Sequence, residues 1–299
     1  MYIYLFLFIG FIILLLGANL LINGSTDIAG KFNISSFLIG LTVVAFGTSA
    51  PEIFVNIRAS FDKYSEIAMG NVLGSNIFNL LFIMAISVII NPIKVKNETV
   101  RFEIPYNFFS IALLYFLLNN FFIIKNSIFI LSGIDGIVLL FCFFIFIIFI
   151  IINNKNLSKS GNNRHISRQI KNFKILFNII VGLFMLYFGS KMVVTNSVKI
   201  AKIIGISNRV IGLTIIAVGT SLPELVTSLI SIFKKEANLA LGNLLGSNIF
   251  NLLFILGLSS IINTIRVSNE MLIDIVFNAI SGGLIFIFVY FDKNKKLTE

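Results

Sequence analysis

Two short segments of the sequence combine a carboxylate, two hydroxyls and a proline. They read GTSAPE at residues 47–52 and GTSLPE at residues 219–224. Carboxylate, hydroxyl and carbonyl oxygens are hard ligands that suit Ca²⁺ and Na⁺, whereas the thiolate and imidazole groups that softer metals prefer are missing from both segments. In each segment the threonine and the glutamate are four residues apart and share one face of a helix. These pairs are Thr48 with Glu52 and Thr220 with Glu224.

The proline of each segment stands in the middle of an apolar stretch. Proline cannot donate to the carbonyl four residues earlier, so Pro51 frees the Gly47 carbonyl and Pro223 frees the Gly219 carbonyl. Such a carbonyl costs several kcal/mol in hydrocarbon unless protein, water or an ion satisfies it, and a carboxylate at mid-membrane costs roughly 2.5–3.5 kcal/mol. A kink with a buried acid could be a packing device, but two uncompensated acids on matching broken helices favour bound cations.

Two polar stripes follow the proline segments. In each, side chains spaced four residues apart share one helix face. The stripes are Asn71, Ser75 and Asn79, and Asn243, Ser247 and Asn251. We expect all four stretches to converge on one oxygen-rich centre. The glycines beside the stripes, Gly70-xxx-Gly74 and Gly242-xxx-Gly246, are typical of close helix contacts.

The composition specifies the elements that must position these residues. Hydrophobic residues make up 57% of the 299 residues and charged residues only 12%, and the mean hydropathy is +0.99, which indicates an integral membrane protein. Runs of about 20 apolar residues can each span a bilayer as a helix. We expect nine spans, near 2–22, 37–60, 67–91, 104–121, 127–152, 173–195, 209–232, 239–262 and 272–291. The first span has no cleavage site after it, so we expect it to stay in the protein.

The sequence repeats itself at a constant shift of 172 residues. Residues 40–52 match residues 212–224 at 9 of 13 positions, and residues 70–83 match 242–255 at 13 of 14. A constant register without a gap indicates two structural repeats. Since five spans per repeat is an odd number, the second repeat enters the membrane from the opposite side. We therefore predict an all-α membrane protein with two inverted-topology repeats and broken helices at the ion site.

The predicted division of the chain follows the repeats. Residues 1–152 form the first repeat, with five helices and its internally repeated stretch at 37–91. Residues 173–299 form the second, with four helices and the matching stretch at 209–262. By the same shift, the partner of the fifth span begins near residue 299, so we expect no tenth helix within this sequence. Residues 153–172 form a basic loop between the repeats.

The net charge of +10 could suggest a nucleic-acid partner, but its distribution argues for a lipid bilayer instead. The 153–172 loop contains lysines and arginines and no acid, which is typical of a cytoplasmic loop. We therefore expect a multi-pass protein of the cell (plasma or inner) membrane, with the N-terminus outside and the C-terminus inside. The oligomeric state is left open, a monomer included.

The motifs as a whole resemble the paired alpha-repeats of the sodium/calcium exchanger family, prokaryotic type, in the cation/calcium antiporter superfamily. The resemblance rests on the two GTSxPE segments, each followed by GNxLGSNIFN, and it covers nearly the whole chain. It implies a secondary antiporter that exchanges Na⁺ for Ca²⁺ by alternating access. The ions would bind at a mid-membrane site between the repeats, and no cofactor would be needed.

The resemblance also implies which residues bind the ions. Glu52 and Glu224 would be the main carboxylate ligands. The hydroxyl and amide ligands would be Thr48, Ser49, Thr220, Ser221, Ser75, Ser247, Asn79 and Asn251, and the carbonyls of Ala45 and Ala217 would serve flanking Na⁺ sites. Some relatives, including the potassium-dependent branch, have an aspartate where this chain has Asn251, which lowers the expectation of K⁺ cotransport.

Three alternatives remain from the residues. A Ca²⁺/H⁺ antiporter of the same superfamily would use the same glutamates, and only a test of the driving ion separates the two. A channel would repeat its acidic residues around a symmetric pore, whereas two inverted repeats in one chain favour alternating access. An intramembrane enzyme would need a catalytic arrangement that the sequence does not show, because Cys142 and His165 are the single cysteine and histidine and no cofactor motif is present. We interpret these two as a packed thiol and a solvated loop side chain.

Overall fold

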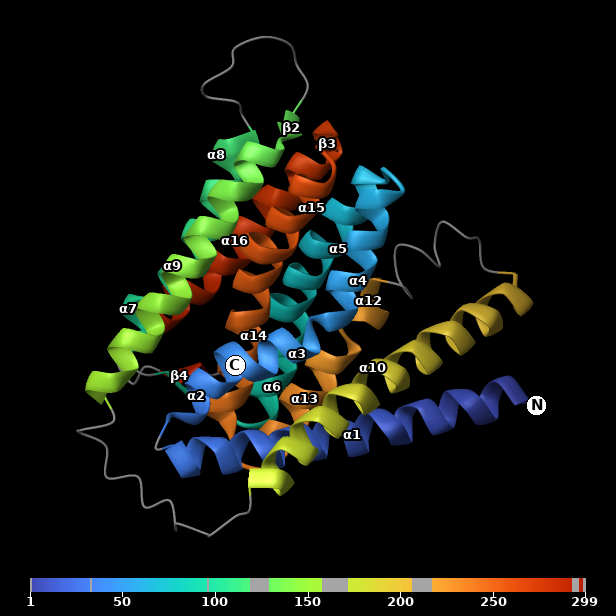
Figure 1. Cartoon of the computed structure of the whole chain (residues 1–299), viewed down its shortest axis with the longest axis vertical. Coiled ribbons are helices and arrows are strands. Elements are labelled where there is room, and N and C mark those ends of the chain that lie inside the picture. Colours follow the sequence, from blue (N-terminus) through green and yellow to red (C-terminus); the bar gives the residue numbers. More distant parts are fainter. Residues whose placement is uncertain are drawn as a thin grey trace. The chain divides into compact units, whose positions relative to one another are not determined.

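The computed structural model is almost entirely helical (Figure 1). It describes residues 2–32, 34–95, 97–118, 129–157, 172–205, 217–291 and 296–297; His165 and most of the basic loop lie outside them. The elements of the N-terminal half are α1 (Tyr2–Phe32), α2 (Ser36–Ile39), the π-helical turn η1 (Gly40–Val44), α3 (Ala45–Thr48), α4 (Ala50–Phe61), α5 (Ser65–Ile77), the π-helical turn η2 (Phe78–Ile83), α6 (Met84–Ile90), β1 (Ile93–Lys94), α7 (Asn97–Arg101), α8 (Glu103–Leu118), β2 (Phe129–Leu131) and α9 (Gly133–Leu157).

The C-terminal half repeats much of this order. Its elements are α10 (Asn172–Ile203), α12 (Ala217–Thr220), α13 (Leu222–Phe233), α14 (Ala237–Ile249), the π-helical turn η4 (Phe250–Ile255), α15 (Leu256–Ile262), β3 (Ile265–Val267), α16 (Asn269–Phe291) and β4 (Lys296–Leu297). The two π-helical turns η2 and η4 carry the same six residues, FNLLFI. Local structure therefore follows the sequence repeat at this place.

Each predicted span falls on a helix, although several boundaries differ. Among the described residues, six helices are long and apolar enough to cross a membrane, or seven if Ser36–Thr48 and Ala50–Phe61 form one broken span. Helix α8, on the fourth predicted span, has only 16 residues. The seventh predicted span begins near residue 209, and residues 206–216 lie outside the described residues. The count of nine spans thus stays a prediction. Helix α1 continues to Phe32, well past residue 22, because its polar end packs against α10 where Gly24 lies against Ile179.

Both expected helix breaks are present. Helix α3 ends at Thr48, and Ser49 leaves the helical region with φ −80° and ψ 8° before α4 begins. Ser221 does the same between α12 and α13, with φ −86° and ψ 6°. The missing proline N–H explains both interruptions, because the preceding turn has lost its hydrogen-bond donor. The serine of each GTSxPE segment is thus the residue at which the helix breaks.

The chain divides into two compact units, which do not coincide with the sequence repeats. Unit 1 comprises residues 1–51 and 152–244, and unit 2 comprises residues 52–151 and 245–299. Each unit thus takes segments from both halves of the chain. The division into repeats remains a prediction from the sequence.

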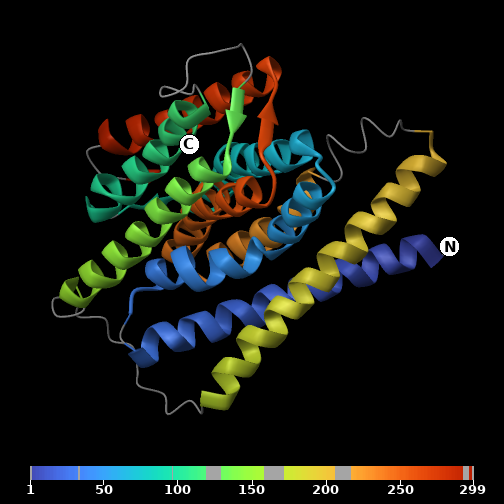
Figure 2. The same cartoon turned by 45° about the horizontal axis from the view of Figure 1, so that its top comes forward.

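Unit 1 is built on the contact between α1 and α10, which lie side by side in both views (Figures 1 and 2). Glycines allow the two backbones to approach closely. A Cβ atom on Gly17 would lie 2.9 Å from the Leu186 nitrogen, and one on Gly189 would lie 2.9 Å from the Leu14 nitrogen. The contact is filled by buried side chains from both helices, among them Leu14, Leu21 and Val193. Gly242, one of the glycines expected at a close helix contact, also lies close to a neighbouring backbone, at the Phe37 carbonyl. Gly70 and Gly74 do not, because a Cβ atom on either would have no described atom of another element within 4 Å.

The end of α13 is fastened to α1 by a lysine. The Lys234 ammonium donates to the Asn23 side-chain oxygen at 2.6 Å and to the Asn19 carbonyl at 3.3 Å. Burial lowers the pKa of Lys234, because the charged form loses part of its hydration. This contact adds a polar anchor to the apolar packing of unit 1.

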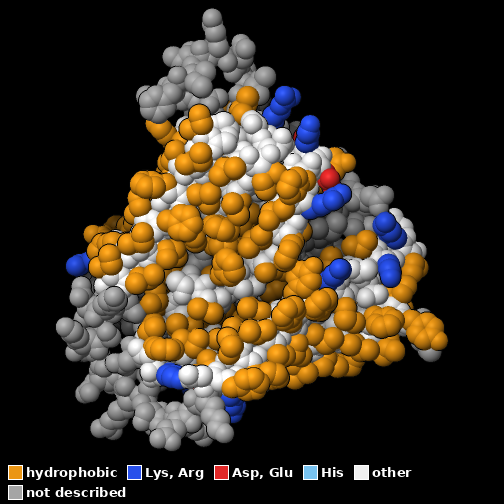
Figure 3. All heavy atoms as spheres, viewed as in Figure 1, with side chains coloured by type: hydrophobic (Ala, Val, Ile, Leu, Met, Phe, Trp, Pro, Cys, Tyr) orange, Lys and Arg blue, Asp and Glu red, His pale blue; other side chains and the backbone are white. Residues whose placement is uncertain are grey.

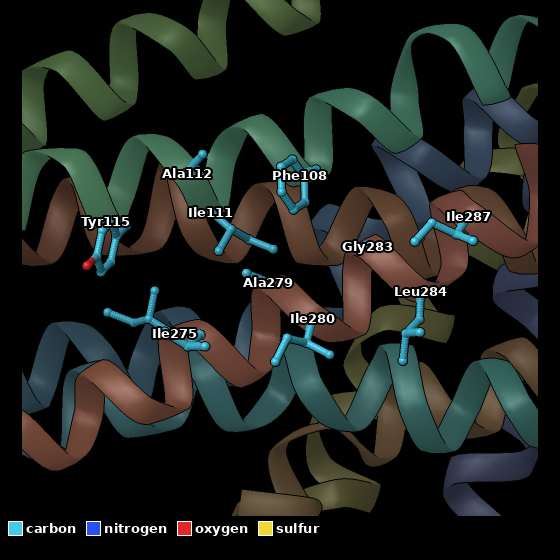
Figure 4. A pocket seen from close by; sticks show the side chains of 11 residues that line it. Phe108, Ile111, Ala112, Tyr115, Ile275, Ala279, Ile280, Gly283, Leu284 and Ile287 are labelled. Atoms are coloured by element: carbon cyan, nitrogen blue, oxygen red, sulfur yellow. The ribbon is translucent and has the colours of Figure 1, made fainter.

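Unit 2 contains α9 packed on η4 and α15, and two short antiparallel sheets that the sequence did not predict. β2 pairs with β3 and β1 pairs with β4, and the first pair is visible in Figures 1 and 2. Helices α8 and α16 line an apolar groove of about 520 Å³ (Figure 4). Its lining includes Phe108, Ile111 and Gly283, and every lining side chain except that of Tyr115 is purely hydrocarbon.

Apolar side chains dominate the face shown in Figure 3. Large hydrophobic residues along α1, α9 and α16 are highly exposed, such as Phe8, Phe141 and Phe288. In water, such a surface would drive association. On long apolar helices it instead fits contact with lipid.

Candidate cation site

In unit 1, the second glutamate is contacted by a serine of the first proline segment. Glu224 stands in the first turn of α13 and is 0% exposed. The Ser49 hydroxyl donates to its Oε1 at 3.0 Å. Because a carboxylate can accept several hydrogen bonds, this contact orients the group and leaves it able to bind a cation.

A second chain of contacts in unit 1 starts at Thr48. The Thr48 hydroxyl lies 3.1 Å from the Asn243 Oδ1 and 3.3 Å from the Ala45 carbonyl. The Asn243 amide nitrogen in turn donates to the Ser228 hydroxyl at 3.4 Å. The first helix break and Asn243 are therefore connected within unit 1.

One carbonyl freed by proline already has a partner in the protein. The Ser190 hydroxyl of α10 donates to the Gly219 carbonyl at 2.8 Å. The proline in this segment predicts that the carbonyl is released from the helix, and the Ser190 hydroxyl gives it a partner. It is therefore a weaker candidate for an ion ligand than the carboxylates.

In unit 2, the first glutamate has its own hydroxyl partner. Glu52 lies in the first turn of α4 and is 0% exposed. The Ser75 hydroxyl of α5 donates to its Oε1 at 3.3 Å. Farther along the same two helices, the Asn71 amide donates to the Asn56 Oδ1 at 2.7 Å. Each candidate glutamate is thus buried and held by a serine, in its own unit.

Unit 2 also contains a ring of four asparagines, which we call the asparagine ring: Asn76, Asn79, Asn248 and Asn251. The Asn79 amide donates to the Asn248 Oδ1 at 3.0 Å, and the Asn251 amide donates to the Asn76 Oδ1 at 3.0 Å. Asn76 and Asn248 also donate to each other's backbone carbonyls, at 3.0 and 3.4 Å. Positions 172 residues apart therefore make equivalent contacts.

Two backbone carbonyls fix how all four amides are turned. A carbonyl only accepts, so the Asn248 carbonyl requires the NH₂ group of Asn76, and the Asn76 Oδ1 is left to accept from Asn251. Asn251 must therefore use its own NH₂ group within the ring. In the same way, the Asn76 carbonyl requires the NH₂ group of Asn248, so the Asn248 Oδ1 accepts from the NH₂ group of Asn79.

The ring leaves two oxygens over. The Oδ1 atoms of Asn79 and Asn251 are buried and have no hydrogen-bond partner among the described residues. A buried acceptor without a partner costs roughly 1–3 kcal/mol, so a ligand is expected to satisfy it. Since each NH₂ group is already engaged in the ring, the unpartnered atom of both amides is an acceptor, and an acceptor is what a cation needs.

The predicted ligand residues are almost all buried. Glu52, Glu224, Thr48, Ser49, Ser221, Ser247, Asn79 and Asn251 are 0% exposed, Ser75 and Ala45 are 1% exposed, and Thr220 is 7% exposed. Ala217 begins α12, but its side chain lies outside what the structure describes. Within the described residues, no three His, Cys, Asp or Glu side chains gather to form a metal cluster. Any cation bound here would depend on neutral oxygens as well as on carboxylates.

Several residues that hydrogen-bond to the predicted ligands were not predicted from the sequence. Asn76 and Asn248 complete the ring, and Asn56 and Ser228 hold the asparagines of the two stripes. A stripe of period four excludes Asn76, which stands three residues before Asn79. The signal was nevertheless present, because positions three apart also share a helix face and Asn76 belongs to the repeated GSN triplet.

Fold and site together define a helical multi-pass membrane protein whose interior carries carboxylate, hydroxyl and amide oxygens, the class to which ion transporters belong. The family model described as "Sodium/calcium exchanger protein" matches residues 2–152 and 174–298. The chain therefore belongs to the sodium/calcium exchanger family, which makes it a cation/calcium antiporter.

Individual relatives agree with this assignment. The chain is 37% identical to the putative antiporter CaxA of Alkalimonas amylolytica, over 86% of this chain and 80% of that protein. It is 31% identical to the sodium/calcium exchanger MaX1 of Methanosarcina acetivorans, over 90% and 85%. Among solved structures, the sodium-calcium exchanger NCX_Mj soaked with Na⁺ and Ca²⁺ superimposes with a TM-score of 0.84 at 30% identity, covering 100% of this chain and 92% of that one.

Proposed function

We propose that this protein couples Ca²⁺ transport to a Na⁺ gradient, by alternating access, in a cell membrane with the N-terminus outside. The observation that carries the proposal is the pair of buried glutamates, each at a proline-broken helix and each held by a serine hydroxyl at 3.0 or 3.3 Å. Family membership and the likeness to a Na⁺- and Ca²⁺-soaked exchanger support it.

Each ligand has a role in this proposal. Glu52 and Glu224 carry the negative charge that pairs with the ion. Asn79 and Asn251 contribute neutral oxygens that the asparagine ring leaves without a hydrogen-bond partner among the described residues. The hydroxyls and carbonyls that complete the proposed set are those of Thr48, Ser49, Thr220, Ser221, Ser75, Ser247, Ala45 and Ala217.

Charge counting explains why one site could serve both ions in turn. Two carboxylates balance one Ca²⁺ or two Na⁺, so either load removes the cost of burying the acids. Additional Na⁺ would have to bind to neutral oxygens. With asparagine at both positions 79 and 251, the set carries no third carboxylate, which is the basis for expecting no K⁺ cotransport.

The test is uptake of radioactive Ca²⁺ into proteoliposomes that are loaded with Na⁺ and diluted into Na⁺-free buffer. We expect uptake that requires internal Na⁺ and is lost in Glu224→Gln. A matched control is Glu66→Gln, because Glu66 is exposed at the start of α5 and should transport normally.

Two outcomes would overturn the proposal. Uptake driven by a pH gradient alone, without Na⁺, would make the protein a Ca²⁺/H⁺ antiporter. Equal uptake by Glu224→Gln and by Glu66→Gln would remove the glutamate from the ion site.

A further inference from the structure

The apolar groove between α8 and α16 lies where matching faces of the repeated sequence meet (Figure 4). Each of the four α8 residues that line it corresponds, at the shift of 172 residues, to a lining residue of α16. Phe108 corresponds to Ile280 in this way, and Tyr115 corresponds to Ile287. The groove is therefore a product of the repeat.

Small residues keep the groove deep. Three of its lining residues, Ala112, Ala279 and Gly283, have no side-chain atom beyond Cβ. Larger lining residues are partly exposed, such as Ile280 at 53% and Ile287 at 50%. The groove thus opens on the apolar outer surface of the two helices, which faces lipid in a membrane.

The dimensions of the groove decide what can fill it. Its lining on α16 runs from Ile275 to Ile287, which is about 18 Å of helix. The volume of about 520 Å³ divided by this length gives a mean cross-section of about 29 Å², whereas a helix about 10–12 Å wide needs roughly 80–110 Å². One leaflet of hydrocarbon is about 15 Å deep. A single acyl chain of a phospholipid therefore fits the groove, and a helix does not.

Helix packing of the α9 kind leaves the groove open. Helix α9 contacts α8 at Tyr106, whose ring lies 4.5 Å from that of Phe146, and Tyr106 does not line the groove. The residue that corresponds to Tyr106 in α16 is Asn278, which does not line it either. The groove is thus a surface of its own on both helices.

Basic residues gather at the end of the groove where α8 begins and α16 ends. Helix α7 contacts both helices there, and Arg101 in its last turn is exposed. Strand β4 contacts α16 at the same end, and its register with β1 places Lys94 directly opposite Lys296. We call Lys94, Arg101 and Lys296 the basic end. Like charges on directly opposite residues destabilise an antiparallel pair, so an anion beside these strands would be stabilising.

Acidic residues do not cancel this charge. In the described residues of β1, α7, α8 and β4, the acids are Glu98 and Glu103, two against three basic residues. One oxygen of the Glu103 carboxylate is buried, which makes its charge less available at the surface. At the opposite end of the groove, β3 and the first turns of α16 carry Arg266 against Glu270 and Asp274. The two ends of the groove thus differ in the sign of their charge.

We propose that this groove binds an acyl chain of an anionic phospholipid whose headgroup lies against the basic end. The apolar walls hold the chain, and the charge selects the headgroup. Each basic residue near an anionic lipid surface strengthens binding by about fivefold. This inference rests on shape and charge alone, so it is independent of the transported ion. It goes beyond antiport by assigning the protein a lipid-binding site.

Tryptophan fluorescence gives a direct readout, because the chain contains no tryptophan. Ile280→Trp introduces a single fluorophore in the groove. The protein is placed in vesicles with equal amounts of phosphatidylglycerol and phosphatidylcholine, and one lipid at a time carries brominated acyl chains, which quench a tryptophan that they touch. The matched control is Ile148→Trp, since Ile148 is 56% exposed on α9 and does not line the groove.

We expect phosphatidylglycerol to be favoured over phosphatidylcholine by about fivefold or more at Ile280→Trp, and the two lipids to bind about equally at Ile148→Trp. Adding Lys94→Gln and Arg101→Gln should remove the selectivity at Ile280→Trp. Equal selectivity at both tryptophan positions would show an ordinary lipid contact and would overturn the proposal. Selectivity that survives the loss of Lys94 and Arg101 would place the headgroup elsewhere, which would overturn it as well.

Filling the groove tests the same site without tryptophan variants. Phosphatidylglycerol added to the protein in a neutral detergent should raise the unfolding temperature by about 2–4 °C more than phosphatidylcholine does, because it binds the folded state more tightly. Ala279→Phe should remove this difference. The control Ala85→Phe should keep it, because Ala85 is exposed outside the groove. A difference of the same size in Ala279→Phe would contradict binding in the groove.

Discussion

Replacing Asn76 tests whether the asparagine ring sets ion affinity. Asn76→Leu keeps the branched shape and the number of side-chain heavy atoms but removes two hydrogen bonds of 3.0 Å, one to the Asn248 carbonyl and one from the Asn251 amide. Both partners are buried. The Asn251 amide is then no longer held, and its Oδ1 is no longer turned toward a ligand.

The size of the effect follows from the groups left unpaired. A buried polar group without its partner costs about 1–3 kcal/mol, although hydrogen bonds between membrane helices average only about 0.6 kcal/mol. If the full loss of about 1–3 kcal/mol falls on ion binding, the apparent affinity for the ion should fall by about 5- to 150-fold. Asn248→Leu should behave alike, because its contacts repeat those of Asn76.

The assay is Na⁺-driven Ca²⁺ uptake measured over a range of both ions, together with the unfolding temperature. Asn107→Leu is the matched control, because Asn107 is 3% exposed and has no hydrogen-bond partner among the described residues. An Asn76→Leu protein that unfolds at a lower temperature but keeps its ion dependence would refute the reasoning. The ring would then serve packing alone.

Four further outcomes can be checked on the same protein. Glu52→Gln and Glu224→Gln should abolish Ca²⁺ uptake without lowering the unfolding temperature, since removing a buried charge also removes its desolvation cost; near-normal flux would refute their role. Asn251→Asp should make uptake fall as the pH rises, because a carboxylate has no proton to donate into the ring; a flat pH profile would contradict this. Gly182→Leu should destabilise unit 1 by about 1–3 kcal/mol, since even a Cβ would lie 2.9 Å from the Gly17 carbonyl, and an unchanged unfolding temperature would argue against close packing. Gly257→Leu should likewise lower the unfolding temperature by displacing α9.

The sequence predicted the parts of the fold that depend on local chemistry. Apolar runs identified the helices, and proline placed the breaks at Ser49 and Ser221. Burial of Glu52 and Glu224 followed from their positions inside apolar segments. These features could be predicted because hydrogen-bond loss at proline and helix length are properties of the chain itself.

Contacts between distant elements could not be predicted in the same way. The turning of the Asn79 and Asn251 amides depends on two carbonyls of other helix segments, which no spacing rule specifies. The hydrogen bond from Ser190 to the Gly219 carbonyl is another example, since α10 lies far from the break in sequence. The two small sheets could not be predicted either, because strands of two or three residues are too short to show a periodic pattern of apolar residues.

The hydrogen bond from Ser190 also makes the two broken helices chemically unequal. In the repeat, Ser190 corresponds to Ala18 of α1, and alanine has no proton to give. Helix α10 is therefore tied to the second break by a bond that α1 cannot form at the first, a difference of about 1 kcal/mol, or roughly fivefold in an equilibrium. The two repeats are nearly symmetric in sequence, yet moving the helix at the second break and moving the helix at the first break need not cost the same free energy.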